Sequence, residues 1–530
     1  MSFASAAFVG FAAVLIFLYY VVPKKIQWAV LLAGSYFFYY FAGLDALAFI
    51  AVTTVSTYLV GLWLERRVRA EKTYLDALGD TVSKDEKKAY REHAKKKRFL
   101  ILCAGLVLNF GILAVLKYTA FALDGINGLI RSFGYKSDLS VGWVIIPLGI
   151  SFYIFQSMSY LIDVYRGKTQ CERNFFRFAL FVSFFPQLVQ GPISRHKDLA
   201  PELYAPHQFS TDNFMAGGIR VAFGYFKKMV IADRVLVAVK AKVDAPDNYN
   251  GLYVVMLIIL YSVQIYADFT GGMDITIGIS RMLGIRLVEN FDRPFSSKST
   301  KEYWRRWHIT MGSWFTDYVF YPLSVCKPMQ KLSKFSREKL GKTVGKRIPV
   351  YLATIATWFL TGLWHGAGLN FIVWGLLNCL VILVSQELSP LYDKFHKACP
   401  RLVASRPYGV FMMARTFMLM GTIRILDVYR DVPLTFRLWG SMFTTFNYTD
   451  LWNGAMLELG LGRADWILLL IATAIMFAVS LWGIREPVRD KLERHPAMEA
   501  AAIVLVLLCV MVFGAYGVGF DASQFIYNQF

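Results

Sequence analysis

Long apolar runs separated by short polar segments recur along the whole 530-residue chain. A helix needs about 20 mostly apolar residues to cross the hydrocarbon core of a bilayer, so these runs predict membrane-spanning helices. The segment 213–240 has a helical pattern but carries several charged residues, and we expect it to lie in the interface or to re-enter the membrane. The predicted spans are roughly 5–22, 26–42, 45–64, 99–117, 142–163, 176–190, 251–267, 349–367, 369–388, 408–427, 465–483 and 498–516.

Composition agrees with a chain whose main solvent is lipid. Apolar residues make up 56% of the sequence and charged residues 18%, whereas soluble domains carry about a quarter charged residues. The net charge of +20 would suggest nucleic acid in a soluble protein. Here the basic residues gather in short segments between apolar runs, and no nucleic-acid motif or metal-binding spacing is present. We therefore expect the lipid bilayer as partner, with no nucleic acid and no metal.

The basic segments predict the orientation of the chain. Residues 65–98 contain 12 Lys or Arg, and residues 327–347 contain eight against one acidic residue. By the positive-inside rule, 65–98 and 327–348 are predicted to be cytoplasmic loops. Counting spans from them places both termini outside, so that 517–530 is an extracytoplasmic tail. The simplest organisation is one membrane-embedded domain over 1–530, crossing the cell membrane many times.

One histidine lies inside an apolar stretch where a bilayer normally excludes ionisable groups. His365 is flanked by Gly362, Gly366 and Gly368 within residues 357–378. Ionisable side chains at bilayer depth are costly and tend to face a cavity or a partner. An imidazole there is suited to act as a general base. A neutral histidine held by a hydrogen bond in a helix bundle is the alternative interpretation.

A second segment, 289–323, is too polar for a lipid-facing span. Within it, Arg305, Arg306 and His308 alternate with Trp304 and Trp307. Arginines beside indole rings suit recognition of phosphate or carboxylate groups. An interfacial amphipathic helix with an aromatic belt would have the same composition.

Two weaker features are also consistent with a cavity. Asp268 and its polar neighbours interrupt the apolar run at 264–278, either to line a cavity or to join helices by hydrogen bonds. Tyr527 lies in the aromatic tail that follows the last predicted span. Such a tail usually anchors at the interface, but a tyrosine hydroxyl on a flexible end could accept a transferred group.

Several motifs together resemble the signature of membrane-bound O-acyltransferases (MBOAT), with the alginate O-acetylation branch as the nearest type and the D-alanyl transfer proteins of teichoic acid synthesis as more distant relatives. Taken together, these motifs are specific, and the resemblance covers nearly the whole chain. They are Trp304-Arg305-Arg306-Trp307-His308, Gly362-Leu363-Trp364-His365-Gly366-Ala367, the 146–153 and 185–192 segments, Tyr266-Ala267-Asp268-Phe269 and Glu289-Asn290-Phe291.

The resemblance implies a helical bundle with re-entrant segments around a central funnel. It implies that His365 is the catalytic histidine and His308 the second family histidine. It also implies that substrate is contacted from these motifs, by Trp304, Arg305, Arg306, Trp307, Trp364, Asp268 and Asn290.

The same resemblance implies acyl transfer from a cytoplasmic thioester, acetyl-CoA or an acyl carrier protein, with no bound cofactor. The acyl group is expected to reach an extracytoplasmic SGNH-type transferase that O-acetylates a polysaccharide. The tail resembles the C-terminus of the small accessory protein of the D-alanylation system, which makes Tyr527 a candidate acyl carrier.

D-alanyl transfer from a carrier protein is the alternative within the enzyme class. A transporter or flippase, or a scaffold without chemistry, would be alternatives of another class.

Overall fold

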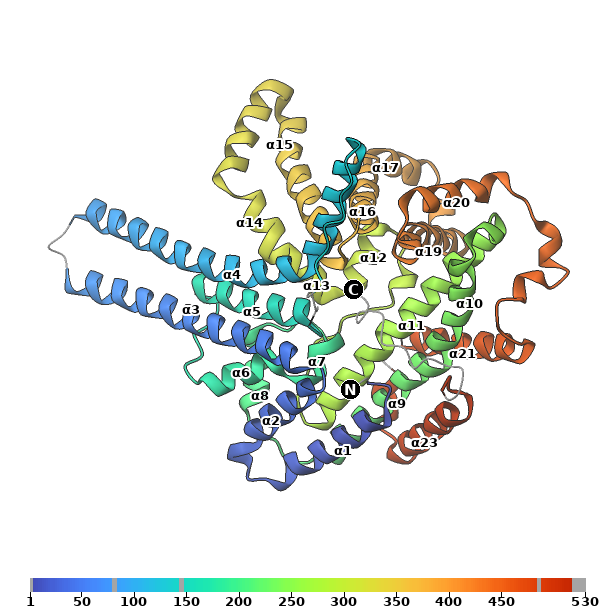
Figure 1. Cartoon of the computed structure of the whole chain (residues 1–530), viewed down its shortest axis with the longest axis horizontal. Helices are drawn as coiled ribbons and strands as arrows, with labels where there is room; N and C mark the ends of the chain where they lie inside the picture. The colour runs from blue at the N-terminus through green and yellow to red at the C-terminus, as the bar shows by residue number, and fades with distance from the viewer. Residues whose placement is uncertain (1–2, 79–82, 143–146, 484–487, 517–530) are drawn as a thin grey trace. The chain divides into compact units, whose positions relative to one another are not determined.

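The computed structural model describes residues 3–78, 83–142, 147–483 and 488–516. Within these ranges every regular element is a helix and no strand is found (Figure 1). The prediction of an all-α, polytopic membrane protein is therefore confirmed. The contacts divide the chain into two compact units, Met1–Phe214 with Ile279–Leu287, and Met215–Gly278 with Val288–Phe530. The expectation of one membrane-embedded domain over 1–530 stays a prediction.

Seven of the described helices are long and apolar enough to cross a membrane. Each overlaps a span that the apolar runs predict. They are α3 (Leu44–Ala77), α4 (Lys84–Ser132), α11 (Leu252–Met282), α16 (Leu369–Glu387), α19 (Arg406–Tyr429), α21 (Arg463–Trp482) and α23 (Pro496–Phe513).

The first unit is built from the N-terminal helices. Within it, α3 packs against α4 and α5, and α2 packs against α6. Besides α3 and α4, its elements are α1 (Ala6–Val21), η1 (Lys24–Ile26), α2 (Gln27–Tyr40), α5 (Ile150–Tyr165), α6 (Phe175–Ser183), α7 (Phe185–Gln190), α8 (His196–Tyr204) and the first residues of α9 (Thr211–Tyr225).

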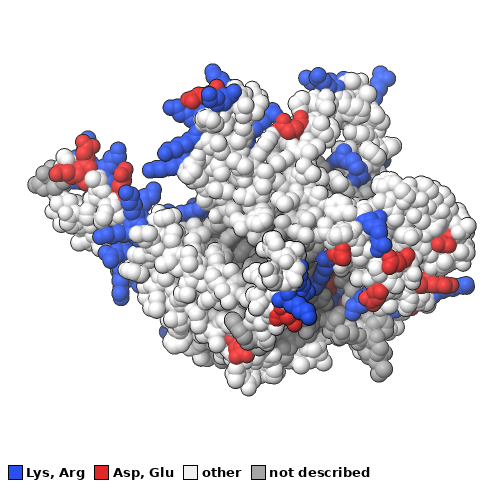
Figure 2. Space-filling view, turned by 45° about the horizontal axis from the view of Figure 1, so that its top comes forward, with Lys and Arg blue, Asp and Glu red and all other residues white. Residues whose placement is uncertain are grey.

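The segment 65–98 is largely helix rather than the loop that its charge pattern suggested. Helix α3 continues to Ala77, and α4 begins at Lys84 behind a capping box that Ser83 forms with Glu86. Lys, Arg, Glu and Ala are strong helix formers, so a basic segment extends a helix as easily as it forms a loop. Figure 2 shows basic side chains together with acidic ones on the projecting ends of these two helices.

The predicted span 176–190 is broken into α6 and α7. Pro186 has no backbone N–H to continue the helix, and Phe184 adopts a non-helical conformation. The N–H of Phe185 donates instead to the hydroxyl of Ser35 on α2, 3.1 Å away. The span predicted at 142–163 is likewise shorter among the described residues, because α5 begins only after Gly149.

Gly149 shows why one of the family-like segments carries a glycine. Its φ is +72°, and a Cβ atom at this position would lie 1.9 Å from the carbonyl oxygen of Leu188. Only glycine fits such a conformation and such a close approach. The 147–153 and 185–192 segments therefore pack directly on each other inside the first unit.

The second unit holds the other motifs. Besides α11, α16, α19, α21, α23 and the rest of α9, its elements are η2 (Phe226–Ala232, a π-helix), α10 (Asp233–Asp244), η3 (Pro246–Asn248), η4 (Pro294–Ser296), α12 (Thr300–Arg306), α13 (Ile309–Phe315), η5 (Thr316–Phe320, a π-helix), α14 (Tyr321–Ser324), α15 (Lys327–His365), α17 (Ser389–Ala398), α18 (Pro400–Val403), α20 (Val432–Thr444), η6 (Tyr448–Leu451), η7 (Ala455–Leu457) and α22 (Val488–Leu492).

The segment 327–348 is also helical, which corrects a second predicted loop. It forms the first part of α15, interrupted at Gly341, where φ is +80°. A Cβ atom on Gly345 would lie 2.4 Å from the backbone nitrogen of Arg337. The glycines therefore allow the chain to kink sharply there, and the predicted span 349–367 is the second part of the same helix.

The charged segment 213–240 forms α9, a π-helical turn and α10. Lys228 in the π-helix makes two ion pairs, with Asp233 at 2.7 Å and with Asp268 of α11 at 2.6 Å. All three side chains are buried. Pairing makes burial of these charges tolerable, so this segment packs inside the second unit rather than lying as a simple amphipathic surface helix.

Candidate functional site

The site is built around a tight turn between two apolar helices. Helix α15 ends at His365, the backbone is extended at Gly366 and Gly368, and α16 begins at Leu369. A Cβ atom on Gly362 would lie 2.4 Å from the carbonyl oxygen of Phe371. A Cβ atom on Gly375 would meet the carbonyl oxygen of Trp358 at the same distance. Glycine at these positions thus lets α15 and α16 pack close together and fixes where His365 stands.

His365 is half-buried and enclosed by aromatic rings. Its ring centroid lies 4.4 Å from that of Trp374 on α16 and 5.1 Å from that of Trp364. It is also the last residue of α15, at the negative end of the helix dipole. A positive charge is favoured at such a helix end.

His308 stands on the connection between α12 and α13. Its φ of +48° and ψ of +54° place it in the left-handed region, and its side chain is fully buried. Its Nδ1 lies 3.2 Å from the amide oxygen of Asn290, which also accepts from the backbone N–H of Thr310 at 3.0 Å. Because a backbone N–H can only donate, the group facing it is the amide oxygen. His308 Nδ1 must then carry the proton, which leaves the lone pair on Nε2.

The two histidines share a neighbour. Trp364 lies with its ring centroid 5.7 Å from His308 and 5.1 Å from His365. Phe269 of α11 also contacts His308, with 4.9 Å between the two ring centroids. Burial lowers the pKa of His308 to about 3, so its ring is neutral at physiological pH. The structure therefore places both predicted histidines in one aromatic cluster.

The tryptophans of α12 attach the His308 connection to the α15–α16 pair. Trp304 lies edge-to-face with Trp358, at 4.9 Å, and with Trp374, at 5.7 Å. Edge-to-face pairs of this kind add about 0.5–1.5 kcal/mol to the effect of burial. Trp374 therefore contacts Trp304 as well as His365.

Trp307 is fixed by a buried arginine. The guanidinium of Arg424 on α19 lies 4.1 Å from the ring centroid of Trp307 and donates to the hydroxyl of Tyr303 at 2.9 Å. The rings of Tyr303 and Trp307 are stacked at 5.7 Å. A desolvated cation–π contact can contribute about 2 kcal/mol, so this contact positions the residue that precedes His308.

Three other predicted residues stand apart from the histidines. Arg305 is exposed, and Arg306 pairs with Glu302 at 2.8 Å. Asp268 is buried in the ion pair with Lys228, although the next residue, Phe269, touches His308. Tyr527 lies outside the described residues.

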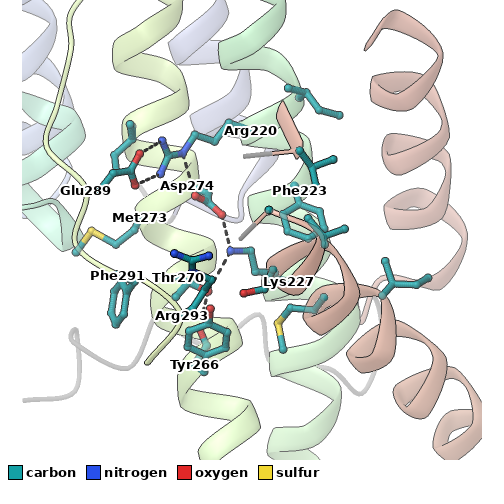
Figure 3. Close-up of a pocket in the computed structure, with 18 of the residues that line it drawn as sticks. Arg220, Phe223, Lys227, Tyr266, Thr270, Met273, Asp274, Glu289, Phe291 and Arg293 are labelled. Atoms are coloured by element: carbon teal, nitrogen blue, oxygen red, sulfur yellow. Dashed lines mark hydrogen bonds and ion pairs between the residues drawn. The ribbon is translucent and has the colours of Figure 1, made fainter. Parts of the chain in front are cut away.

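A cavity of about 720 Å³ adjoins the site through Asn290, which is one of its lining residues. Figure 3 shows Arg220 between two carboxylates of its wall. The guanidinium donates to both oxygens of Glu289, at 2.7 and 2.6 Å, and its Nε donates to Asp274 at 2.9 Å. Arg220 thereby holds the residue that precedes Asn290, and through it the partner of His308.

Several of these residues were not identified from sequence. Arg424 and Trp374 lie within predicted spans, and a lone arginine in an apolar run is itself a signal of a buried role. Arg220 and Asp274 lie in the segments 213–240 and 264–278, whose polar residues the sequence shows without indicating their partners. Arg220 reaches Asp274 across 54 residues of chain and Glu289 across 69, and no local pattern indicates these contacts.

Comparison with known proteins shows the family of this chain. The model of the membrane-bound O-acyltransferase family matches residues 172–426, a range that includes His308 and His365. A probable alginate O-acetylase AlgI from Azotobacter vinelandii is 30% identical over 487 residues, 91% of this chain and 85% of that protein. A peptidoglycan O-acetyltransferase from Helicobacter pylori is 32% identical over 59% of this chain and 60% of that protein. A teichoic acid D-alanyltransferase from Bacillus subtilis is 24% identical over 51% of this chain and 65% of that protein.

The seven candidate spans, the family segments around both histidines and a relative that matches along most of its length lead to one conclusion. The chain belongs to the membrane-bound O-acyltransferase family and is a multi-pass membrane O-acyltransferase.

Proposed function

We propose that this enzyme passes an acetyl group from a cytoplasmic thioester, acetyl-CoA, across the cell membrane for O-acetylation of an extracellular or cell-wall polysaccharide. The support from relatives is that those matching most of the chain are named as alginate O-acetylases, and another as a peptidoglycan O-acetyltransferase. The observation that carries the proposal is the setting of His365, at the end of α15 between two indole rings and close to a second buried histidine.

In the proposed reaction, His365 takes the proton from an acceptor hydroxyl. The oxygen then attacks the thioester carbonyl carbon, the carbon–sulfur bond breaks, and the thiolate leaves with the proton from the imidazolium. General-base help of this kind typically contributes about 10²- to 10⁴-fold in rate. The helix end beneath His365 favours the imidazolium that exists between the two proton transfers.

His308 is proposed to act beside His365 rather than as a second base of the same kind. Its neutral ring presents Nε2 as an acceptor, because Nδ1 donates to Asn290. Trp304, Trp307 and Trp364 are proposed to border the donor, with Asn290 at the edge of the neighbouring cavity. Arg305, exposed on α12, is proposed to meet the donor phosphates, while Arg306 would have to exchange its contact with Glu302 to do so. Asp268 is proposed to contribute to the substrate-facing wall through α11.

The first acceptor is proposed to be the hydroxyl of Tyr527, with the acetyl group then handed to an extracytoplasmic SGNH-type transferase. In this scheme both termini are outside the membrane and the basic helical ends of α3, α4 and α15 are inside. Basic ends could also meet an acidic acyl carrier protein, which would serve D-alanyl transfer. A Tyr527→Phe variant with normal transfer would remove the tyrosine from the scheme.

Membranes containing the full chain, incubated with radiolabelled acetyl-CoA, test the proposal. The wild type is expected to transfer label to the polymer fraction, and His365→Ala to lose at least about 10²-fold of that rate. His396→Ala, at an exposed position on α17, is the matched control and should transfer normally. Normal transfer by His365→Ala would contradict the proposed mechanism. Transfer of D-alanine from a loaded carrier protein, with no use of acetyl-CoA, would replace acetyl transfer by the alternative.

A further inference from the structure

The cavity beside Asn290 has two walls of different chemistry. One wall comes from α9, the η2 π-helix, α11 and the 289–293 segment, and the other from α21, α22 and α23. Its volume of about 720 Å³ lies in the range of sites that enclose an organic ligand. All lining residues belong to the second unit. Figure 3 shows Arg220 and Lys227 pointing toward Asp274 and Glu289 on the first wall.

The polar wall carries charges of both signs in equal number. Three lining residues are cationic and three are anionic, namely Arg220, Lys227, Arg293, Asp274, Glu289 and Asp292. Such a wall does not favour a ligand of strong net charge, because each added charge would meet as many like charges as opposite ones. It favours a ligand that carries one group of each sign.

The charges are also graded in depth. The cationic side chains of Arg220, Lys227 and Arg293 are 9%, 9% and 27% exposed, whereas the anionic ones of Asp274, Glu289 and Asp292 are 15%, 46% and 51% exposed. The bonds of the Arg220 guanidinium to Asp274 and Glu289 use three of its five N–H groups. Donors for a phosphate oxygen therefore lie deeper, and acceptors for an ammonium group lie nearer the surface.

The opposite wall is aliphatic. Its members include Ile475, Met476, Val479, Leu492 and Val506. The helices that carry most of them, α21 and α23, are the least buried of the candidate spans, with 17% and 11% of their apolar windows covered by protein. These helices therefore border the lipid, and a hydrocarbon chain lying against them would not leave an apolar environment.

We propose that this cavity binds one zwitterionic glycerophospholipid from the bilayer. Its phosphate lies against Arg220 and Arg293, its ammonium group against Glu289 and Asp292, and its acyl chains between α21 and α23. Basic pockets between membrane helices select anionic lipids. This cavity differs from such pockets because its wall carries as many anionic as cationic side chains. The site goes beyond the proposed function, and lipid binding does not require that acetyl be the transferred group.

Filling the cavity tests the proposal directly. Ala502 on α23 lines the cavity, whereas its neighbour Ala501 is exposed. Ala502→Trp and Ala501→Trp place the same side chain one residue apart on the same helix. The full chain, delipidated in detergent, is titrated with fluorescent phosphatidylethanolamine and fluorescent phosphatidylglycerol. Wild type and Ala501→Trp should bind the ethanolamine lipid about tenfold more tightly than the glycerol lipid, and Ala502→Trp should lose this binding.

A head-group variant gives a second measurement. Arg293 has a positive φ of 48°, a conformation that asparagine tolerates. Arg293→Asn should weaken binding of phosphatidylethanolamine about tenfold, whereas Arg430→Asn, at another arginine of positive φ, should leave it unchanged. Equal binding of the two lipids by the wild type, or equal lipid binding by Ala502→Trp and Ala501→Trp, would overturn the proposal. A wild type that transfers no acetyl group but still prefers phosphatidylethanolamine would count against the proposed function alone.

Discussion

The Nδ1 atom of His308 lies 3.2 Å from the amide oxygen of Asn290, and this contact ties the WRRWH segment to the chain that leaves α11. The same oxygen accepts from the backbone N–H of Thr310 at 3.0 Å and from its hydroxyl at 2.9 Å. The backbone carbonyl of Asn290 accepts from the N–H of Ile309 at 2.9 Å. One asparagine therefore fixes the tautomer of His308 and the start of α13 together.

Replacement of Asn290 by alanine should cost both stability and activity. The donors of His308 and Thr310 would be left buried without their acceptor, which destabilises the fold by about 1–3 kcal/mol. We expect acyl transfer to fall at least about tenfold, because the imidazole loses its fixed tautomer. Asn127→Ala is the matched control, since Asn127 is a buried asparagine that accepts from Ser137 and Leu139 in the first unit. A similar loss of activity in both variants would show that the effect is general destabilisation.

Trp374 should affect the rate more than substrate affinity. Its ring lies 4.4 Å from that of His365 and is almost fully buried. In Trp374→Leu we expect kcat to fall about tenfold or more with little change in KM, because the imidazole is no longer held in place. Trp374→Phe keeps an aromatic ring and should recover part of the rate. Trp452→Leu, at a residue 87% exposed, should behave as wild type in the same steady-state assay.

Acid should destabilise the protein partly through His308. The unfolded chain binds a proton at this residue near pH 6.5, whereas burial lowers the pKa in the folded protein to about 3. Below pH 6.5 the unfolded state therefore binds more protons, and this contribution to stability is complete above pH 6.5 and lost as the pH falls toward 3. The slope from this one group is about 1.4 kcal/mol per pH unit.

A variant without the ionisable ring isolates that contribution. His308→Gln should show a shallower loss of unfolding temperature between pH 6.5 and pH 5 than the wild type, measured in the same detergent. His93→Gln changes an exposed histidine on α4 and should keep the wild-type slope. If His308→Gln had the same slope as the wild type, the folded protein would have to protonate His308 in this range.

Arg220 should act on catalysis from a distance. Its two hydrogen bonds to Glu289 form a bidentate pair that a lysine cannot reproduce. In Arg220→Lys we expect a lower kcat, and Glu289→Gln should have an effect in the same direction. The double variant should lose less than the sum of the two, because both changes break one contact. Arg437→Lys, at an exposed pair with Asp247, should leave kcat unchanged, and additive losses at Arg220 and Glu289 would contradict the coupling.

The orientation can be tested by cysteine labelling. In a variant with the six native cysteines replaced, Lys95→Cys and Lys339→Cys should react with a membrane-impermeant thiol reagent only after the membrane is opened. Trp452→Cys should react in intact cells, because the span count places the segment before α21 outside. All three positions are exposed. Reaction of Lys95→Cys in intact cells would reverse the assignment.

Part of the fold could be predicted because the relevant signals are local. Seven predicted spans became helices that meet the length and hydropathy of membrane spans, since apolar content over about 20 residues is a property of each segment alone. The break at Pro186 and the kink at Gly341 needed the structure, although the residues that permit them are visible in the sequence. The basic segments were misjudged as loops, because charge reports the orientation of a segment and not its backbone conformation.

The sequence by itself determined the class of this protein, its family segments and His365 as the leading candidate for the chemistry. Only the tertiary structure decided which side chains meet. Arg424 reaches Tyr303 across 121 residues of chain, and Asn290 reaches His308 across 18. Such contacts depend on how helices pack, and packing is set by the shapes of all neighbouring side chains together rather than by any one segment.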